Sequence, residues 1–408
     1  MKKIYFNQPS FDAQLLRVIS HVYHGCSDIG ECLVTASHIQ EGNFESWYEE
    51  WKKTAERILS IAITSENLGH NVSAREAYLR SSNYFRTSYF FLADDPADIR
   101  VREALDMHIE TFDKAAKLFD PRFEAVEIPF ENTMLPGYFY SAANTKKPKP
   151  TIIANGGYDS THQEAYFAFV PAALSRGYNV LAFDGPGQGA VLFNQHIPMR
   201  YDWEKVISPV IDFLLNRRCV DKNKIALYGP SWGGMLTPRA AAFETRLAAL
   251  VVNPGQYDAL EAIKSAANIT DETPLQLEDH IETFLKAAMQ DKYVAHKLKL
   301  KLFIHGLDCP KDLFEEWKDY NLIDISPKIQ CPTFVADSES EPLSKGQALK
   351  LYETLLCPKT YSVFGNGEGA GAHCAAGAIG QFSQRVFDWL DETLDVNTPA
   401  SLSESIEA

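Results

Sequence analysis

Length, composition and charge limit what this chain can be. It has 408 residues, 45% hydrophobic and 12% aromatic, so it can bury a large core divided among about two or three domains. Its formal net charge of −15 argues against nucleic acid or an anionic membrane as a partner, because those surfaces select for lysine and arginine.

The N-terminus and the cysteines predict a cytoplasmic protein. The opening segment MKKIYFNQPSFDAQ has too short an apolar stretch for a signal peptide. No run approaches the roughly 18 apolar residues that a membrane-spanning helix needs. The seven cysteines are odd in number and without paired spacing, which is typical of reduced thiols.

Residues 1–121 carry helical patterns and predict an N-terminal helical domain. In segment 43–63, apolar side chains recur at three- and four-residue spacing on one helical face, namely Trp47, Trp51, Ala55, Ile58, Leu59 and Ala62. The segment from Ser73 to Glu76 has the capping-box pattern, so a helix should begin at Ser73. A further helix is expected over 97–119.

From residue 122 onward, short apolar strands alternate with helices. Segments 122–131 and 135–142 are typical of a hairpin, and the later strands are apolar throughout. This alternation predicts an α/β fold with a mainly parallel sheet and helices on both faces. We assign 122–255 and 327–395 to this core, whose ligands should bind at the carboxyl ends of the strands.

Two segments fall outside the alternation. Residues 256–326 are helical and charged, and they interrupt the strand-helix order as a cap inserted above an active site would. The polar tail 396–408 is predicted to be disordered.

The segment YGPSWGGM places Ser231 in the pattern G-x-S-x-G, between an apolar strand and a helix-forming segment. This is the context of a nucleophile on a tight strand-to-helix turn. The residues two before and two after it must be small, and here they are Gly229 and Gly233. The turn also places Ser231 at a helix N-terminus, which favours developing negative charge. Ser231 is the candidate nucleophile, and a merely tight turn is the alternative.

A serine nucleophile needs a base, and on such a sheet the partners follow in the order serine, acid, histidine. Of the eleven histidines, only His373 lies beyond the expected cap, in a loop of small residues after a predicted strand. His373 is the candidate base, against the alternative of a surface-loop histidine.

The acid has several candidates in one turn. Asp337, Glu339 and Glu341 follow a predicted strand, where an acid can hold the far imidazole nitrogen. Asp337 lies near the end of the strand, whereas a side chain deeper in the turn is better placed to reach His373. Glu341 is the first choice and Asp337 the alternative.

The segment IIANGGYDST offers backbone donors for an oxyanion. Gly156 and Gly157 let the chain approach a substrate, so the amide of Tyr158 or Gly157 could point at the reacting oxygen. The second donor would be the amide of Trp232, which follows the nucleophile.

One motif suggests a nucleotide site and another a metal site, but neither has the spacing that such a site requires. The segment 184–190, DGPGQGA, lacks the G-x-G-x-x-G spacing of a dinucleotide loop. HVYHGC together with Cys32 matches no zinc module. We expect no cofactor and no metal.

Several segments together resemble one family. GPSWGGMLTPRAAAFETRLAALV, NGGYDSTHQE, FDGPGQG, CPTFVADSESEPLSKGQ and GAGAHC are similar to the α/β-hydrolases that include 2,6-dihydroxypseudooxynicotine hydrolase and the fungal pigment-pathway hydrolases that shorten polyketide chains. The resemblance covers nearly the whole chain. It implies an α/β-hydrolase fold, a helical domain and cap that cover the site, a role in secondary metabolism, frequent dimers, and no metal or cofactor.

By position, the family's nucleophile falls on Ser231, its histidine on His373 and its acid on Glu341. The family usually has aspartate at the acid position, so glutamate is a departure, one methylene longer. Either Glu341 substitutes for it or Asp337 has taken its place.

These residues predict a serine hydrolase of a small molecule. It would cleave an ester, or a carbon-carbon bond of a ketone or polyketide-like substrate, through an acyl-enzyme. The resemblance also implies a homodimer. Two alternatives stay open: an acyltransferase with the same three residues, and a non-catalytic binding protein on the same fold.

Overall fold

A computed structural model of the chain describes residues 3–142, 147–266, 283, 287, 289–342 and 344–396. Two predictions therefore fall wholly or partly outside the described residues. One is the tail 396–408, which the sequence predicts to be disordered. The other is the part of the predicted cap between residues 267 and 288.

A single sheet of eight strands forms the centre of the described structure, in the order β1-β2-β4-β3-β5-β6-β7-β8. The strands are β1 (Glu124–Phe130), β2 (Thr133–Tyr140), β3 (Lys149–Asn155), β4 (Asn179–Phe183), β5 (Val220–Pro230), β6 (Ala249–Asn253), β7 (Thr333–Ser338) and β8 (Lys359–Phe364). Only the β1–β2 and β2–β4 pairs are antiparallel. The predicted mainly parallel sheet is confirmed.

Helices cover both faces of the sheet, because its central strands are apolar on both sides. One face packs against α6 (His162–Ala168), α7 (Val170–Leu174) and α16 (Ile379–Thr393). The other packs against α8 (Gly189–Gln195), α9 (Glu204–Leu215), α10 (Gly233–Phe243) and α15 (Gln347–Thr354). Successive side chains of β3 therefore point to opposite faces of the sheet. Ile152 is buried under the helices of the first face and Ile153 under those of the second.

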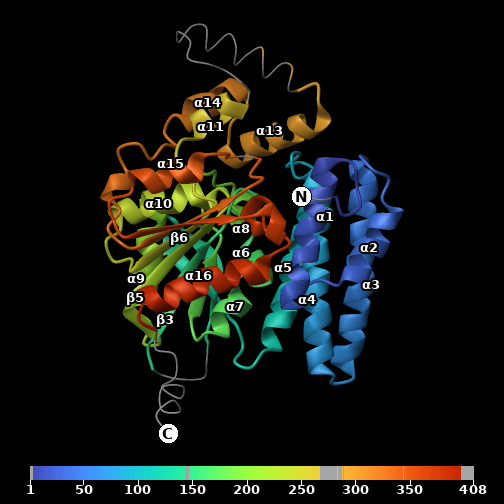
Figure 1. Ribbon diagram of the computed structural model, residues 1–408. Coiled ribbons are helices and arrows are strands. Elements are labelled where there is room, and N and C mark those ends of the chain that lie inside the picture. Colours follow the sequence, from blue (N-terminus) through green and yellow to red (C-terminus); the bar gives the residue numbers. More distant parts are fainter. Residues whose placement is uncertain are drawn as a thin grey trace.

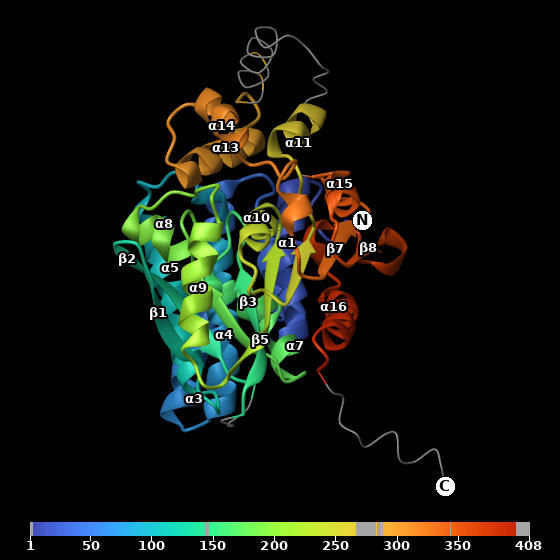
Figure 2. The ribbon, with the colours of Figure 1, turned by 90° about the vertical axis from the view of Figure 1, so that its left-hand side faces the viewer.

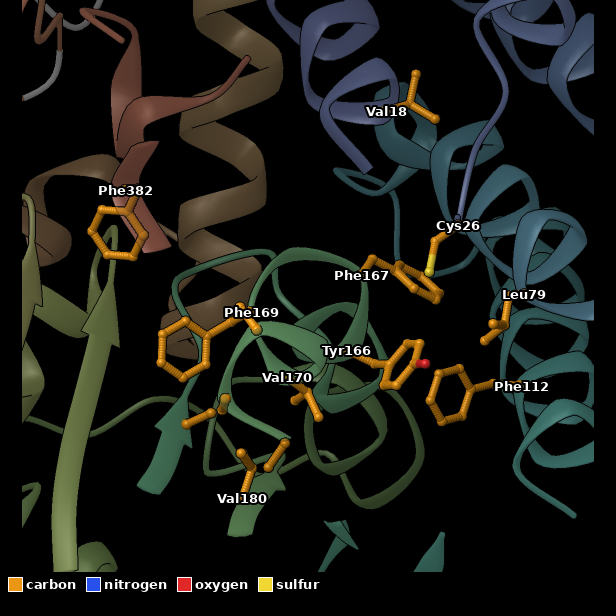
Figure 3. Close-up of a cluster of buried hydrophobic side chains, with 14 of the residues drawn as sticks. Val18, Cys26, Leu79, Phe112, Tyr166, Phe167, Phe169, Val170, Val180 and Phe382 are labelled. Atoms are coloured by element: carbon orange, nitrogen blue, oxygen red, sulfur yellow. The ribbon is translucent and has the colours of Figure 1, made fainter. Parts of the chain in front are cut away.

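The N-terminal helices pack on the first of these faces, beside α6 (Figures 1 and 2). Figure 3 shows Phe112 of α5 facing Tyr166 of α6, and their ring centroids are 5.9 Å apart. The helices are α1 (Pro9–Ser20), α2 (Ile29–His38), α3 (Phe44–Asn67), α4 (Asn71–Ser88) and α5 (Ile99–Lys117), with short 3-10 turns η1 (His21–His24) and η2 (Phe90–Leu92).

The predicted apolar face of α3 is buried, apart from Leu59, which is half-buried. The predicted start of the next helix was wrong, however. Helix α4 begins at Asn71, because the Ala74 amide already bonds to the His70 carbonyl. Ser73 therefore lies within the first turn, exposed, and no side chain caps this helix.

Helices inserted after β6 lie at the end of the molecule where α10 and α15 begin (Figures 1 and 2). They are α11 (Ala259–Ala266), α13 (Lys292–His305) and α14 (Pro310–Trp317), followed by the 3-10 turn η3 (Ser326–Lys328). We call this group the cap. Helix α13 also contacts the N-terminal region. His296 Nδ1 lies 2.9 Å from a carboxylate oxygen of Asp94, in the turn between η2 and α5.

No helix in the described ranges is long and apolar enough to cross a membrane.

Candidate active site

Ser231 occupies a strained turn between β5 and α10. Its φ angle is +55°, a conformation that residues other than glycine rarely adopt. Its amide donates to the Asn253 carbonyl at 2.7 Å, at the end of the neighbouring strand β6. The turn thereby holds the Ser231 side chain at the carboxyl edge of the sheet.

Glycine is required beside this turn for steric reasons. A Cβ on Gly229 would lie 2.3 Å from Thr237 Oγ1 and 2.4 Å from the Gly233 carbonyl oxygen, far inside contact distance. A Cβ on Gly233 would lie 3.0 Å from the Gly156 carbonyl oxygen, which is tight rather than impossible. A side chain at position 229 would therefore meet closer contacts than one at position 233.

His373 lies between Ser231 and Glu341. It opens the 3-10 turn η5 (His373–Ala375) after β8, and its Nε2 lies 2.9 Å from Ser231 Oγ. Its Nδ1 lies 2.7 Å from Glu341 Oε2. The Glu341 side chain is 1% exposed and that of His373 is 27% exposed. The structure thus brings together the first-choice acid, the histidine and the serine.

The alternative acid is engaged elsewhere. The Asp337 carboxylate accepts hydrogen bonds from the Tyr361 hydroxyl at 2.7 Å and from the Ser338 amide at 2.8 Å. Burial raises the pKa of Asp337. Glu339 accepts the Asn366 amide at 2.6 Å. Only Glu341, deepest in the turn, reaches the imidazole.

Electrostatics favour a charged His373. Burial disfavours the imidazolium, but the neighbouring Cys374 sulfur and the Glu341 carboxylate outweigh burial and raise the pKa of His373 well above its usual value. A carboxylate can only accept hydrogen bonds, so a neutral His373 carries its proton on Nδ1 and leaves Nε2 free to accept the Ser231 hydroxyl proton. This is the arrangement that a general base requires.

The loop 156–161 lies directly against the serine, and we call it the oxyanion loop after the role predicted for it from sequence. A Cβ on Gly157 would be 2.8 Å from Ser231 Cβ. The Gly157 amide donates to Ser160 Oγ at 2.8 Å, so it is not a free donor, contrary to the alternative drawn from sequence. The amides of Tyr158 and Trp232 have no acceptor in the part of the chain that the structure describes.

Sequence reasoning missed the role of Gln188, which is 1% exposed. Its Nε2 donates to the carbonyls of Gly156 at 2.9 Å and Gly157 at 3.0 Å, and its Oε1 accepts the Gly185 amide at 3.0 Å. The glycine-rich segment that resembled a nucleotide loop therefore supports the oxyanion loop instead.

A partly buried ion network behind the oxyanion loop also escaped sequence reasoning. Arg17 contacts Asp159 at 2.5 Å and Glu164 at 2.6 Å, and Arg86 lies 3.3 Å from both carboxylates. Burial opposes the charge on Asp159, but Arg17 and Arg86 together hold its pKa well below the usual range. The two arginines come from α1 and α4, so the N-terminal helices fix this side of the loop.

Aromatic side chains surround the serine turn. The Tyr158 ring stacks on Trp232 with centroids 4.4 Å apart, and Trp232 lies 5.3 Å from the Tyr320 ring. A narrow cavity borders the oxyanion loop, between the N-terminal helices, α8 and α13. Its lining includes Arg86, Tyr89, Phe90, Phe193, Leu300 and Ile304.

The residues considered for a metal are engaged in helix packing. Cys32 is buried in the N-terminal core, with its sulfur 3.1 Å from Ser27 Oγ. Within the described ranges, no group of three or more His, Cys, Asp or Glu side chains could hold a metal ion.

Known proteins resemble this chain over most of its length. It matches the family described as "Esterase FrsA-like" over residues 20–278. It is 31% identical to "Hydrolase LUC6" of a Fusarium species, over 96% of this chain and 98% of that protein. It is also 31% identical to "20-hydroxy-prefusarin hydrolase FUS2" of Gibberella moniliformis, again over 96% and 98%. The predicted resemblance to fungal hydrolases is confirmed.

A solved structure shows the same fold. The crystal structure of 2,6-dihydroxy-pseudo-oxynicotine hydrolase superposes with a TM-score of 0.74, covering 93% of this chain and 96% of that one, at 22% identity. This likeness confirms the predicted α/β-hydrolase fold.

Proposed function

Since the chain belongs to the FrsA-like esterase family and is a hydrolase of the α/β fold, we propose that it is a serine hydrolase with Ser231 as nucleophile, His373 as base and Glu341 as the orienting acid. One observation carries this proposal. His373 lies within hydrogen-bond distance of both partners, through different ring nitrogens. This is the geometry by which a base activates a serine while an acid fixes its tautomer.

The proposed reaction follows from these contacts. Ser231 Oγ attacks a substrate carbonyl while its proton passes to His373 Nε2, and Glu341 stabilises the resulting imidazolium. The amides of Tyr158 and Trp232 donate to the oxyanion. Collapse of the tetrahedral intermediate breaks the bond to the leaving group, which takes the proton from His373. Water, deprotonated by His373, then hydrolyses the acyl-enzyme and restores Ser231.

We propose a ketone or polyketide-like small molecule as substrate, cleaved at a carbon-carbon bond, with an ester as the alternative. Carbon-carbon cleavage requires a leaving carbanion that is stabilised as an enolate or a phenolic ring. The stacked rings of Tyr158 and Trp232 suit a flat, conjugated molecule beside the serine. The relative from Gibberella moniliformis is named for 20-hydroxy-prefusarin, which supports a substrate of this kind.

Turnover in ¹⁸O-labelled water tests the proposal. An aryl ester and a conjugated β-diketone are offered to the wild type, to Ser231→Ala and to Ser60→Ala, a matched control in an exposed turn of α3. The proposal expects labelled carboxylate from the wild type and the control, and none from Ser231→Ala. Equal turnover by Ser231→Ala would contradict it, and the faster of the two probes identifies the bond cleaved.

The homodimer stays a prediction, as does the cytoplasmic location. Light scattering of the purified chain measures the first directly.

A further inference from the structure

A chain of hydrogen bonds joins the cap to the oxyanion loop. The Tyr158 hydroxyl lies 3.0 Å from Nε2 of His305, the last residue of α13. His305 Nδ1 lies 2.7 Å from Glu316 Oε1 on α14. Trp317, next in sequence, donates from its indole nitrogen to the same Tyr158 oxygen at 3.2 Å.

The chemistry of the partners fixes the direction of two bonds in this chain. An indole nitrogen only donates, so the Tyr158 oxygen accepts from Trp317. The Glu316 carboxylate only accepts, so His305 carries a proton on Nδ1 and donates it to Glu316 Oε1. His305 Nε2 and the Tyr158 hydroxyl, 3.0 Å apart, complete the chain.

The same residues also hold the second proposed oxyanion donor. The Trp232 ring stacks on the Tyr158 ring and lies 5.3 Å from the tilted Tyr320 ring, and the Tyr320 hydroxyl donates to Glu316 Oε1 at 3.4 Å. Tyr158, Trp232, Tyr320, Glu316 and His305 thus form a closed ring of contacts. The His305 side chain is fully buried within it.

The backbone of Tyr158 is held from the other side as well. The Gly157 carbonyl and the Tyr158 amide belong to one planar peptide, and Gln188 fixes the carbonyl end of that plane. The cap fixes the Tyr158 side chain through the hydrogen bonds of its hydroxyl with His305 and Trp317. An error of about 1 Å in such a group can reduce the rate by about two orders of magnitude.

We propose that His305 and Glu316 are positioning residues, which hold the side chains of Tyr158 and Trp232 so that both backbone amides point at the oxyanion. The inference rests on the proposed function, in which those two amides bind the oxyanion. It makes the cap a part of the catalytic apparatus and not only a cover over it.

Kinetics of four variants test the proposal, with p-nitrophenyl acetate as substrate and a fluorophosphonate as covalent probe. Glu316→Ala and Tyr158→Phe should lower kcat and the rate of phosphonate labelling by about 10- to 100-fold, with KM changed by less than about threefold. Glu316→Gln should stay within about threefold of the wild type, because an amide oxygen still accepts the Nδ1 proton of His305. Glu315→Ala is the matched control, an exposed neighbour that pairs with Lys318.

Two results would overturn the inference. One is a Glu316→Ala variant that keeps the wild-type kcat and labelling rate. The other is loss of activity in Glu316→Gln equal to that in Glu316→Ala, which would mean that a charge and not a hydrogen bond matters. Failure of the wild type to be labelled at Ser231 would instead refute the proposed function, so the two failures are distinguishable.

Imidazole ¹⁵N NMR of the wild type gives an answer that does not depend on how the variants fold. The inference expects a proton on His305 Nδ1, hydrogen-bonded to Glu316. An Nδ1 that carries no proton would contradict it.

Discussion

Glu341 Oε2 lies 2.7 Å from His373 Nδ1, while Asp337, four residues earlier in strand β7, is hydrogen-bonded to Tyr361. Glu341 lies beyond the end of β7, in the turn that follows, and its side chain, one methylene longer than that of aspartate, reaches the imidazole from there. Replacing Glu341 should consequently affect catalysis far more than replacing Asp337.

We predict that Glu341→Gln lowers kcat by about 10²- to 10⁴-fold, because an amide nitrogen facing His373 favours the wrong tautomer. Asp337→Asn, the matched control, should stay within about threefold, since Asp337 contacts no catalytic atom. Steady-state kinetics on one chromogenic ester measure both. A greater loss in Asp337→Asn would reassign the acid.

The pH profile should report the raised pKa of His373. Only neutral His373 can act as base, so kcat/KM is lost as pH falls through the pKa, and this loss should begin at a higher pH than for an ordinary histidine. Glu341→Gln removes a negative charge that stabilises the imidazolium and should move this limb to lower pH. Phosphonate labelling rates across pH give both curves, and an unmoved limb in Glu341→Gln would contradict the assignment.

Gln188→Glu should lower kcat by about 10-fold or more, because a carboxylate cannot donate to the Gly156 and Gly157 carbonyls. Gln195→Glu is the control, since Gln195 ends helix α8, which begins directly after Gln188, and donates to the Met134 carbonyl at 3.0 Å. Equal kinetics of the two variants would show that Gln188 does not position the oxyanion loop.

Arg86→Met should destabilise the protein by about 3 kcal/mol, because it leaves Glu164 buried with one cation fewer. Arg385→Met, which breaks an exposed pair with Glu368, should cost less than about 1 kcal/mol. Urea unfolding at neutral pH measures both free energies. Similar losses would mean that the buried network adds no more stability than a surface pair.

The ion network of Arg17, Arg86, Asp159 and Glu164 should also make the free energy of unfolding depend on pH in the acid range. The arginines depress the pKa of Asp159 and Glu164, so their contribution is present above the ordinary carboxylate pKa and is lost as pH falls through the depressed values. Arg86→Met should therefore flatten the fall in unfolding free energy below about pH 4.

Local patterns were enough to predict the sheet and the serine turn, whereas His373 and Glu341 were predicted from the order of serine, acid and histidine along the chain. Apolar runs identify buried strands, and G-x-S-x-G needs only its own flanking residues to be interpreted. Helix starts were less certain. The capping-box pattern at Ser73 lies within the first turn of α4, because the backbone bonds of that turn form without a cap from the described side chains.

The contacts that support the oxyanion loop could not be predicted in the same way. Arg17 and Asp159 are separated by 142 residues, and Tyr158 and His305 by 147. Nothing in the local sequence of either partner indicates the other. Gln188 carried a signal, the glycine-rich segment around it, but its hydrogen bonds depend on how β4 and β3 pair in the sheet.

The most direct test of the central claim is the intact mass of the protein after exposure to a small fluorophosphonate. The account predicts one adduct on the wild type, none on Ser231→Ala and slower labelling of His373→Ala. An adduct of equal extent on Ser231→Ala, or no adduct on the folded wild type, would contradict the assignment of Ser231 as the nucleophile.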